Sequence, residues 1–132
     1  MDTIPDLRQF GGADAYLRTC PSRTVLAVLA NKWMTLIVPA LRGGPVRFGE
    51  LRRRLDGITQ KSLTQALRNL ERDGLVERTM HSTIPPRVEY SLTSLGHSAS
   101  DLLESLREWA EKHMQEILSA RAAYEARESN HR

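Results

Sequence analysis

The chain has 132 residues and a formal net charge of +3, and this length is enough for one domain with a buried core. Its one cysteine, Cys20, excludes a scaffold held by intramolecular disulfides, and the longest apolar run, Leu36–Leu41, is far too short to cross a bilayer. The first residues have neither the basic start nor the apolar core of a secretory signal, so the sequence predicts a cytoplasmic protein without membrane contact.

The positive charge lies in the middle of the chain. Residues 20–92 carry 12 Lys and Arg against 6 Asp and Glu, whereas residues 1–19 and 93–132 are each slightly acidic. Such a local excess of cations is typical of a surface that binds a polyanion such as nucleic acid.

The first part of the chain predicts an arm and two helices. Residues 1–19 are expected to form a loose arm with a short helix over Ala13–Arg18. A helix is expected to begin at Pro21-Ser22, because both residue types favour the start of a helix. A strongly apolar helix follows over Lys32–Arg42, where Pro39 is expected to kink the helix or shift its hydrogen bonds. Its expected inward side chains are Trp33, Leu36, Ile37, Ala40 and Leu41.

The middle of the chain predicts two more helices separated by a turn. A brief strand is expected at Arg47-Phe48, and a short helix over Phe48–Leu55. Thr59 is expected to cap the next helix. That helix is expected to end at Asp73-Gly74, where glycine supplies the left-handed conformation that follows many helices.

The rest of the chain predicts a hairpin and a long helix. Two strand-like runs, Leu75–His81 and Arg87–Leu92, are joined by a segment that contains Pro85-Pro86. Thr93 is expected to cap a final helix over residues 94–126.

The helix after Thr59 has an apolar stripe and an unusual opposite face. The stripe has helical spacing and consists of Leu63, Ala66, Leu67 and Leu70. The opposite face carries amide, hydroxyl and cationic groups, and no carboxylate occurs from Thr59 to Leu70. These groups can read base edges and bind phosphates, whereas a carboxylate would be repelled by the DNA backbone.

Two helices joined by a tight turn and followed by a hairpin form the winged helix-turn-helix plan, in which the second helix enters the major groove. We therefore expect an α+β, mostly α, fold with a winged helix-turn-helix and a long carboxy-terminal dimerisation helix. The candidates for the major groove are Gln60, Lys61, Ser62, Thr64, Gln65 and Arg68. Arg87, beside the proline-bearing wing tip, is the candidate for the minor groove. The candidates for phosphate contact are Arg47, Arg53 and Lys61.

Four motifs carry a resemblance to a known family: Cys20-Pro21, Lys32-Trp33, RFGELRRRLDGITQKSLTQALRNLERDGLVER from Arg47, and PPRVEYSLTSLG from Pro85. Over about residues 20–109 the sequence resembles the HxlR-type transcriptional regulators, winged-helix relatives of the MarR group. The family usually has Gly-Lys-Trp where this chain has Asn31 before Lys32-Trp33, a departure confined to a helix junction. The resemblance implies a homodimer that binds double-stranded DNA at an inverted-repeat operator and represses or activates nearby genes.

Cys20 stands where several members of that family carry a cysteine that senses electrophiles, oxidants or aldehydes. Pro21 and Ser22 open a helix whose dipole lowers the pKa of a nearby thiol, and Arg18 and Arg23 could add to that effect. Without a second cysteine, oxidation could give only a sulfenic acid, an adduct, a mixed disulfide or a disulfide between subunits. A sensing role and a purely structural role both remain open.

An apolar stripe on the last helix predicts a dimer interface. About 30 residues make a helix of roughly 45 Å, longer than a small winged domain can cover. An exposed apolar stripe of that size normally marks a partner, and the same helix and the amino-terminal segment of a second subunit are expected to cover it. The stripe residues assigned to the interface are Leu102, Leu103, Leu106, Trp109, Ala110, Met114 and Ile117.

The favoured interpretation is a sequence-specific, dimeric repressor that a redox or electrophile signal at Cys20 releases from its operator. One alternative is the same regulator with a small ligand at the dimer interface and a structural cysteine, and another is a winged protein-interaction module without specific DNA. We expect an arm over residues 1–19, a DNA-binding domain over 20–96, and a dimerisation helix and tail over 97–132. No phosphate loop, nucleophile motif, carboxylate pair or metal-ligand spacing occurs, so no enzyme activity, cofactor or metal site is predicted.

Overall fold

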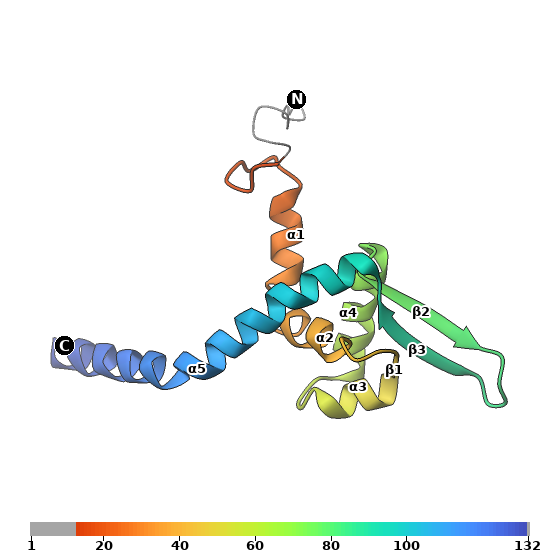
Figure 1. Ribbon diagram of the computed structural model, residues 1–132. Coiled ribbons are helices and arrows are strands. Elements are labelled where there is room, and N and C mark those ends of the chain that lie inside the picture. Colours follow the sequence, from red (N-terminus) through yellow and green to blue (C-terminus); the bar gives the residue numbers. More distant parts are fainter. Residues whose placement is uncertain (1–12, 132) are drawn as a thin grey trace.

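The computed structural model describes residues 13–131, which form a winged helix-turn-helix domain with two projecting helical arms (Figure 1). The elements in chain order are α1 (Ser22–Leu29), α2 (Met34–Ala40), β1 (Val46–Arg47), α3 (Phe48–Arg54), α4 (Gln60–Arg72), β2 (Val76–His81), β3 (Arg87–Leu92) and α5 (Ser94–Asn130). This is the order of helices and strands that the sequence predicts, and the α+β, mostly α, fold class is confirmed.

The predicted short helix over Ala13–Arg18 is wrong. This segment forms consecutive turns, and the N–H of Leu17 donates a hydrogen bond to the carbonyl oxygen of Asp14 at 3.1 Å. The Asp14 carboxylate also accepts a hydrogen bond from the N–H of Tyr16 at 3.0 Å, which stabilises a local turn in place of a helix. The remainder of the predicted arm, residues 1–12, lies outside the described residues.

Helix α2 is shorter than predicted, and its buried face, which includes Ile37 and Leu41 as predicted, differs from the prediction at Leu36. It begins at Met34, just after Asn31, whose side-chain oxygen accepts a hydrogen bond at 2.9 Å from the N–H two residues further on. Pro39 lies in the last turn of the helix, and the backbone hydrogen bonds after it shorten to i→i−3, from the N–H of Leu41 to Val38 and from that of Arg42 to Pro39. Leu36, predicted to point inward, is 37% exposed, while Met34 and Val38 are buried. The difference arises because α5 packs on this side of α2, a contact that the spacing within α2 cannot reveal.

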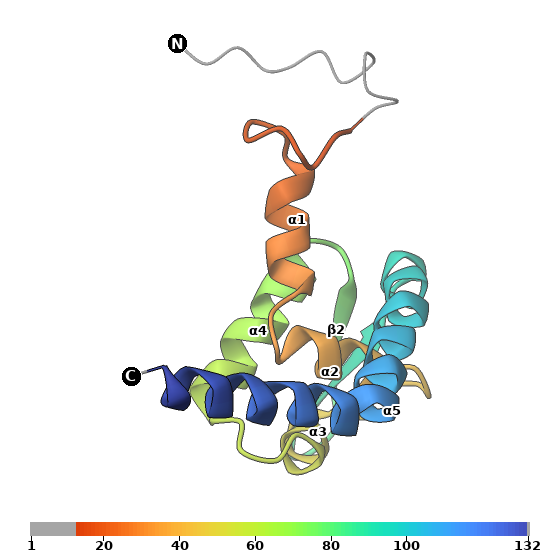
Figure 2. The same ribbon diagram turned by 90° about the vertical axis from the view of Figure 1, so that its left-hand side faces the viewer.

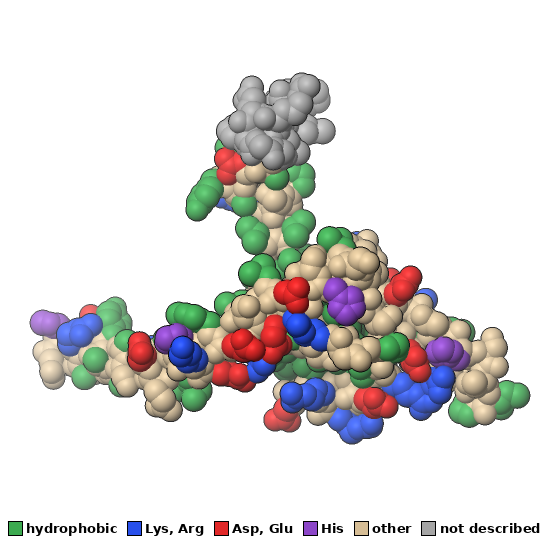
Figure 3. Space-filling model, viewed as in Figure 1, with side chains coloured by type: hydrophobic (Ala, Val, Ile, Leu, Met, Phe, Trp, Pro, Cys, Tyr) green, Lys and Arg blue, Asp and Glu red, His purple; other side chains and the backbone are tan. Residues whose placement is uncertain are grey.

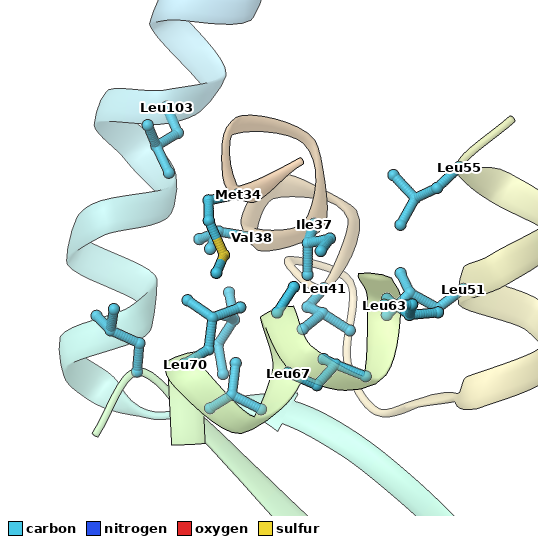
Figure 4. Packing of buried hydrophobic residues seen from close by; sticks show 14 of the residues in the cluster. Met34, Ile37, Val38, Leu41, Leu51, Leu55, Leu63, Leu67, Leu70 and Leu103 are labelled. Carbon is cyan, nitrogen blue, oxygen red and sulfur yellow. The ribbon is translucent and has the colours of Figure 1, made fainter. Parts of the chain in front are cut away.

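The hydrophobic core lies where α2, α3, α4 and the first half of α5 meet (Figure 4). The predicted apolar stripe of α4 points into this core, and α2 faces it through Ile37 and Leu41. Leu103 enters from α5 beside Met34 and Val38. Each fully buried leucine or isoleucine contributes about 1.5–3 kcal/mol to folding. The core therefore fixes how α4 is rotated about its own axis.

The wing is an antiparallel hairpin of β2 and β3, which β1 completes to a three-stranded sheet in the order β1-β3-β2. Near the tip His81 pairs with Arg87, and two residues closer to the domain β1 places Arg47 opposite Glu89. The tip, residues 82–86, extends well beyond the helices (Figure 1). The predicted hairpin is therefore confirmed, and its register brings several charged side chains together.

Hydrogen bonds and a close backbone approach join the beginning of α5 to the base of the hairpin. Thr93 Oγ1 accepts a hydrogen bond from the N–H of Gly96 at 3.0 Å, as expected for a helix cap, and donates one to the carbonyl oxygen of Gly74 at 2.6 Å. Gly96 lies so close to Leu75 that a Cβ atom at this position would overlap the Leu75 carbonyl oxygen. This approach of helix and hairpin requires glycine.

Two helical arms leave the domain in different directions (Figures 1 and 2). Helix α1 rises from the domain, and its Val25 and Leu26 side chains are exposed. Helix α5 has 37 residues and is about 55 Å long. Its first half packs on α2, and its second half changes direction and projects past the domain (Figure 2). Residues 13–131 leave the apolar side chains of both arms uncovered.

Replacing Gly96 with alanine is expected to lower the free energy of unfolding by about 3 kcal/mol, because the backbone must shift to separate the new methyl group from the Leu75 carbonyl oxygen. Gly49→Ala is the control. An added Cβ on Gly49 would meet only the end of the Arg53 side chain, at 3.6 Å, so a gain of about 0.5–1 kcal/mol is expected there. Urea denaturation followed by circular dichroism measures both changes, and equal stability of the two variants would contradict the close approach.

Candidate nucleic-acid interface

Helix α4 is positioned by its cap and by its buried face. Thr59 Oγ1 accepts a hydrogen bond from the N–H of Ser62 at 3.0 Å, so the helix begins at Gln60, as the sequence predicts. Beyond the last helical residue, Gly74 has a φ of 78°, which a residue with a Cβ atom rarely adopts. Because the apolar stripe is locked in the core, the opposite face of α4 is turned away from the domain.

The outward face of α4 brings together five of the six candidates for the major groove. They line an open hollow of about 500 Å³ and are Gln60, Lys61, Thr64, Gln65 and Arg68. The Gln65 amide donates a hydrogen bond from Nε2 to Asn69 Oδ1 at 3.1 Å, which orients its carbonyl oxygen away from Asn69. All the described residues that line this hollow are cationic or neutral and polar, which is the chemistry that base edges and phosphates require.

Ser62 is separated from the other five candidates. It is exposed, but it lies two positions after Gln60, about 200° around the helix axis, and it is absent from the lining of the hollow. Its backbone N–H serves the cap of the helix instead. The helical period alone would have separated Ser62 from the reading face.

A second group of candidates lies where the wing meets α3. A groove of about 600 Å³ is lined there by Arg47, Arg87, Gly49 and the tip residues 83–86, among others. The Arg53 side chain reaches alongside Gly49, so three predicted DNA contacts gather around this groove. Figure 3 shows Lys and Arg side chains along the lower edge of the domain, from α3 to the wing, with a few acids among them.

The Arg87 side chain is paired within the wing. Its Nε lies 3.1 Å from Glu89 Oε1, and the same carboxylate lies 3.2 Å from His81 Nε2 through its other oxygen. Arg87 is therefore directed along the wing in the free chain rather than outward from its tip.

Arg78 lies beside the candidate interface and was not singled out by the sequence analysis. It lines a hollow of about 350 Å³ between α4 and the sheet, together with Thr64, Arg68 and Tyr90. Its Nε lies 3.5 Å from Glu71 Oε2. Burial against this hollow raises the pKa of the Tyr90 hydroxyl. The two-residue alternation from buried Val76 would have placed Arg78 on the face that meets α4.

Cys20 lies beneath the turns that precede α1. Its side chain is 2% exposed, and Sγ lies 3.1 Å from Ser22 Oγ and accepts a hydrogen bond from the N–H of Asp14 at 3.3 Å. The hydrogen bonds from the Ser22 hydroxyl, the Ser22 N–H and the Asp14 N–H, in that order of size, lower the pKa of the Cys20 thiol, because they stabilise the thiolate. Burial and the Asp14 carboxylate oppose this shift but do not cancel it.

The expected contribution of Arg18 and Arg23 to that pKa is wrong. Among the described residues the groups that lower the pKa of the thiol are Ser22 and Asp14. The Arg23 guanidinium instead donates hydrogen bonds to the carbonyl oxygens of Ala15 and Tyr16, at 3.1 and 3.4 Å. Arg23 therefore stabilises the turns that bury Cys20, through the carbonyl oxygens of residues 15 and 16, rather than the Cys20 thiolate.

The apolar stripe of α5 divides between core and surface. Leu103 is 4% exposed and packs in the core of its own chain, so its assignment to a dimer interface is wrong. Leu106 and Trp109 are 48% and 54% exposed. The other exposed members of the stripe are Leu102, Ala110 and Met114, and Ile117 is partly buried.

A cavity of about 760 Å³ is lined by α2, the end of α3 and α5. Its walls include Trp33 and Pro39 on one side and Glu104, Arg107 and Glu111 on the other. Arg107 bridges both glutamates, and its hydrogen bond holds the pKa of the Glu104 carboxyl below its usual range. The cavity thus has an aromatic wall and a wall of paired charges.

Known proteins are similar to this chain in sequence and in fold. The sequence profile of the HxlR-like helix-turn-helix family matches residues 28–118, which include the complete winged domain from α2 to the start of α5. The chain belongs to this family. The resemblance drawn from the sequence is therefore confirmed.

Relatives in this family are similar over most of their length. The uncharacterized HTH-type transcriptional regulator YtfH of Escherichia coli (strain K12) is 40% identical over 121 residues, which span 92% of this chain and 96% of YtfH. The solved structure of the transcriptional regulator ytfH from Salmonella typhimurium has a TM-score of 0.78 at 41% identity, over 83% of this chain and 98% of that one. The redox regulator HypR in its reduced form has a TM-score of 0.69 at 37% identity, over 75% of this chain and 98% of HypR.

Membership of the HxlR-like family makes the chain a helix-turn-helix transcriptional regulator that binds DNA. The relatives named above are described as transcriptional or redox regulators. Among residues 13–131, no helix is both long and apolar enough to cross a membrane.

Proposed function

We propose that the chain represses transcription as a homodimer on an inverted-repeat DNA operator, with α4 in the major groove. The single observation that carries the proposal is the outward face of α4, where five polar or cationic side chains line one hollow without a carboxylate among the described residues. A helix held by its buried stripe can present such a face to base edges with little loss of freedom on binding.

The wing supplies the second DNA contact. In the proposed complex Arg87 enters the minor groove, where a narrow groove at A/T-rich sequence attracts arginine. Arg47, Arg53 and Lys61 contact phosphates on either side of the reading helix. Arg47 and Arg87 line one groove beside the wing tip. Their proximity supports contact of both arginines with the same DNA strand. Arg78 joins this set from the hollow beside Arg68.

The second subunit covers the two arms. A homodimer is proposed because α1 and the projecting half of α5 both expose apolar side chains, including Val25, Leu106 and Trp109. Packing these helices against their copies would bury the apolar surface and place two reading helices at the spacing of two half-sites.

Cys20 is proposed as the site of the signal. HypR is described as a redox regulator and has been solved in oxidised and reduced forms, which supports a redox or electrophile response in this family. The lowered pKa of the Cys20 thiol favours the reactive thiolate. Because the thiol is buried, the turns over residues 13–19 must open before it reacts, and an adduct there would prevent them from closing.

A small ligand is the second candidate for the signal. The cavity between α2 and α5 is large enough for such a ligand and lies between the winged domain and the proposed dimer helix. In this case Cys20 is structural, and the ligand would change the direction of α5 relative to α4.

Replacing Gln65 with alanine is expected to reduce the preference for operator over random duplex by about 5- to 150-fold, because one good base contact is worth about 1–3 kcal/mol. Ser62→Ala is the control, since Ser62 is exposed on the same helix but lies off the reading face. Fluorescence anisotropy with duplex DNA from the region upstream of the gene measures both. Equal discrimination by wild type and Gln65→Ala would refute the assignment of the reading face, and footprinting should reveal two protected half-sites.

Replacing Leu106 with glutamate is expected to convert the dimer to a monomer, because a carboxylate would be buried without a partner in the interface. Gln115→Glu introduces the same charge about 180° around α5 and should leave the dimer intact. Sedimentation velocity gives the mass of each variant. A Leu106→Glu protein that stays dimeric would place the interface elsewhere.

Treatment with a thiol-reactive electrophile is expected to release the wild-type protein from operator DNA and to leave Cys20→Ser bound, because Cys20 is the only thiol in the chain. Anisotropy before and after treatment measures the release, and intact mass spectrometry confirms one adduct per chain. Equal behaviour of the two proteins would make Cys20 structural and favour a ligand in the cavity between α2 and α5.

A further inference from the structure

A hollow between α4 and the wing adjoins the reading face of the helix. It has a volume of about 350 Å³ and lies where α4 packs against β2. Arg78 and Tyr90 are paired across β2 and β3, so their side chains share the face of the sheet that meets α4. The α4 side chains that line the hollow follow the helical period and are Thr64, Leu67, Arg68 and Glu71.

The described residues that line this hollow carry a net positive charge. Arg68 and Arg78 are both cationic, and the Glu71 carboxylate offsets the charge of one of them. Each phosphodiester group of DNA carries a single negative charge. The charge of the hollow therefore matches that of a single backbone phosphate.

Glu71 orients Arg78 without using all of its donors. The Arg78 Nε lies 3.5 Å from Glu71 Oε2, and the Arg78 side chain is 52% exposed. A guanidinium presents its N–H donors in a planar fork, so its two terminal nitrogens can bind a second acceptor while this ion pair stays in place. An arginine held in this way is suited to the paired oxygens of a phosphate.

The Tyr90 hydroxyl supplies a neutral donor beside these cations. Burial raises its pKa, so the hydroxyl keeps its proton at neutral pH and can donate a hydrogen bond. The other groups among residues 13–131 that act on this pKa do so through their charge rather than through a hydrogen bond, and they are Arg78, Glu71 and Arg68. The hydroxyl is thus available to an acceptor in the hollow.

The hollow continues from the reading face of α4. Thr64 and Arg68 line both this hollow and the open hollow that we assign to the bases. Phosphates border the grooves of B-DNA, so a strand whose bases face Gln65 would bring a phosphate within reach of the hollow beside Arg68. This continuity favours a phosphate of the bound DNA over a free anion.

We propose that this hollow holds one backbone phosphate of the operator, with Arg78 and Tyr90 as its donors. A phosphate contact fixes the register and orientation of a protein on the duplex. Here it would lie between the base contacts of α4 and the tip of the wing. The inference rests on the proposed DNA complex and deepens it, because it assigns a role to Tyr90 and gives Arg78 a single partner.

The first test measures DNA affinity by fluorescence anisotropy at several salt concentrations. Tyr90→Phe should weaken binding to upstream and to random duplex alike, by about tenfold, because a hydrogen bond to a charged group is lost without loss of a base contact. Arg78→Gln should weaken both and reduce the slope of log affinity against log salt concentration by about one. The matched controls, Tyr124→Phe and Lys112→Gln, remove a hydroxyl and a positive charge from exposed positions on α5 and should bind as the wild type does.

The second test identifies the phosphate. Uncharged methylphosphonate replaces the phosphates of the upstream duplex one at a time. In each half-site one position is expected where the wild type loses affinity but Arg78→Gln loses little, because the two changes remove the same contact. Lys112→Gln should lose affinity there as the wild type does.

The outcomes separate this inference from the proposed function. Equal losses by wild type and Arg78→Gln at every phosphate, or an unchanged affinity of Tyr90→Phe, would overturn the phosphate site while leaving DNA binding by α4 intact. A failure of wild type to prefer the upstream duplex over random DNA would instead overturn the proposed function.

Discussion

Burial of the apolar stripe of α4 is the interaction on which the rest of the structure depends. Leu63, Leu67 and Leu70 are almost completely removed from solvent against α2 and α3. A helix can turn about its axis only if these side chains leave the core, which would cost several kcal/mol. The polar face is therefore presented at a fixed angle, and the remaining elements either build this core or extend from it.

Two arginines near the candidate DNA interface form ion pairs with glutamates of the same chain. Arg87 and Glu89 are paired in the free wing, and Arg78 is paired with Glu71 beside the reading helix. Partly exposed pairs of this kind contribute little to stability. They can nonetheless orient long side chains before DNA arrives, so that less rotational freedom is lost in the complex. In the proposed complex these acids would therefore act on binding more than on folding.

In the proposed dimer the two arms connect the signal site to the DNA-binding helices. Cys20 lies at the root of α1, and α5 runs from the base of the wing past α2 to its projecting half. The cover over Cys20 consists of short turns held by a few hydrogen bonds, including those from Arg23. Segments with so few contacts open at low free-energy cost. A reaction or ligand that changes how the arms pack would also change the distance between two reading helices.

The sequence by itself determined the element order, the cap at Thr59, the rotation of α4 and five of the six residues that share its reading face, because each follows from local spacing and capping chemistry. It also determined the family, through motifs spread along the chain from Cys20 to Gly96. Only the tertiary structure decided that Met34 and Val38 of α2 are buried in place of Leu36, that Leu103 belongs to the core of its own chain, and that Glu89 lies beside both Arg87 and His81. These depend on contacts between α5 and α2 or between β2 and β3. The periodicity of a single element indicates which of its faces is apolar, but it does not indicate which neighbouring element covers that face.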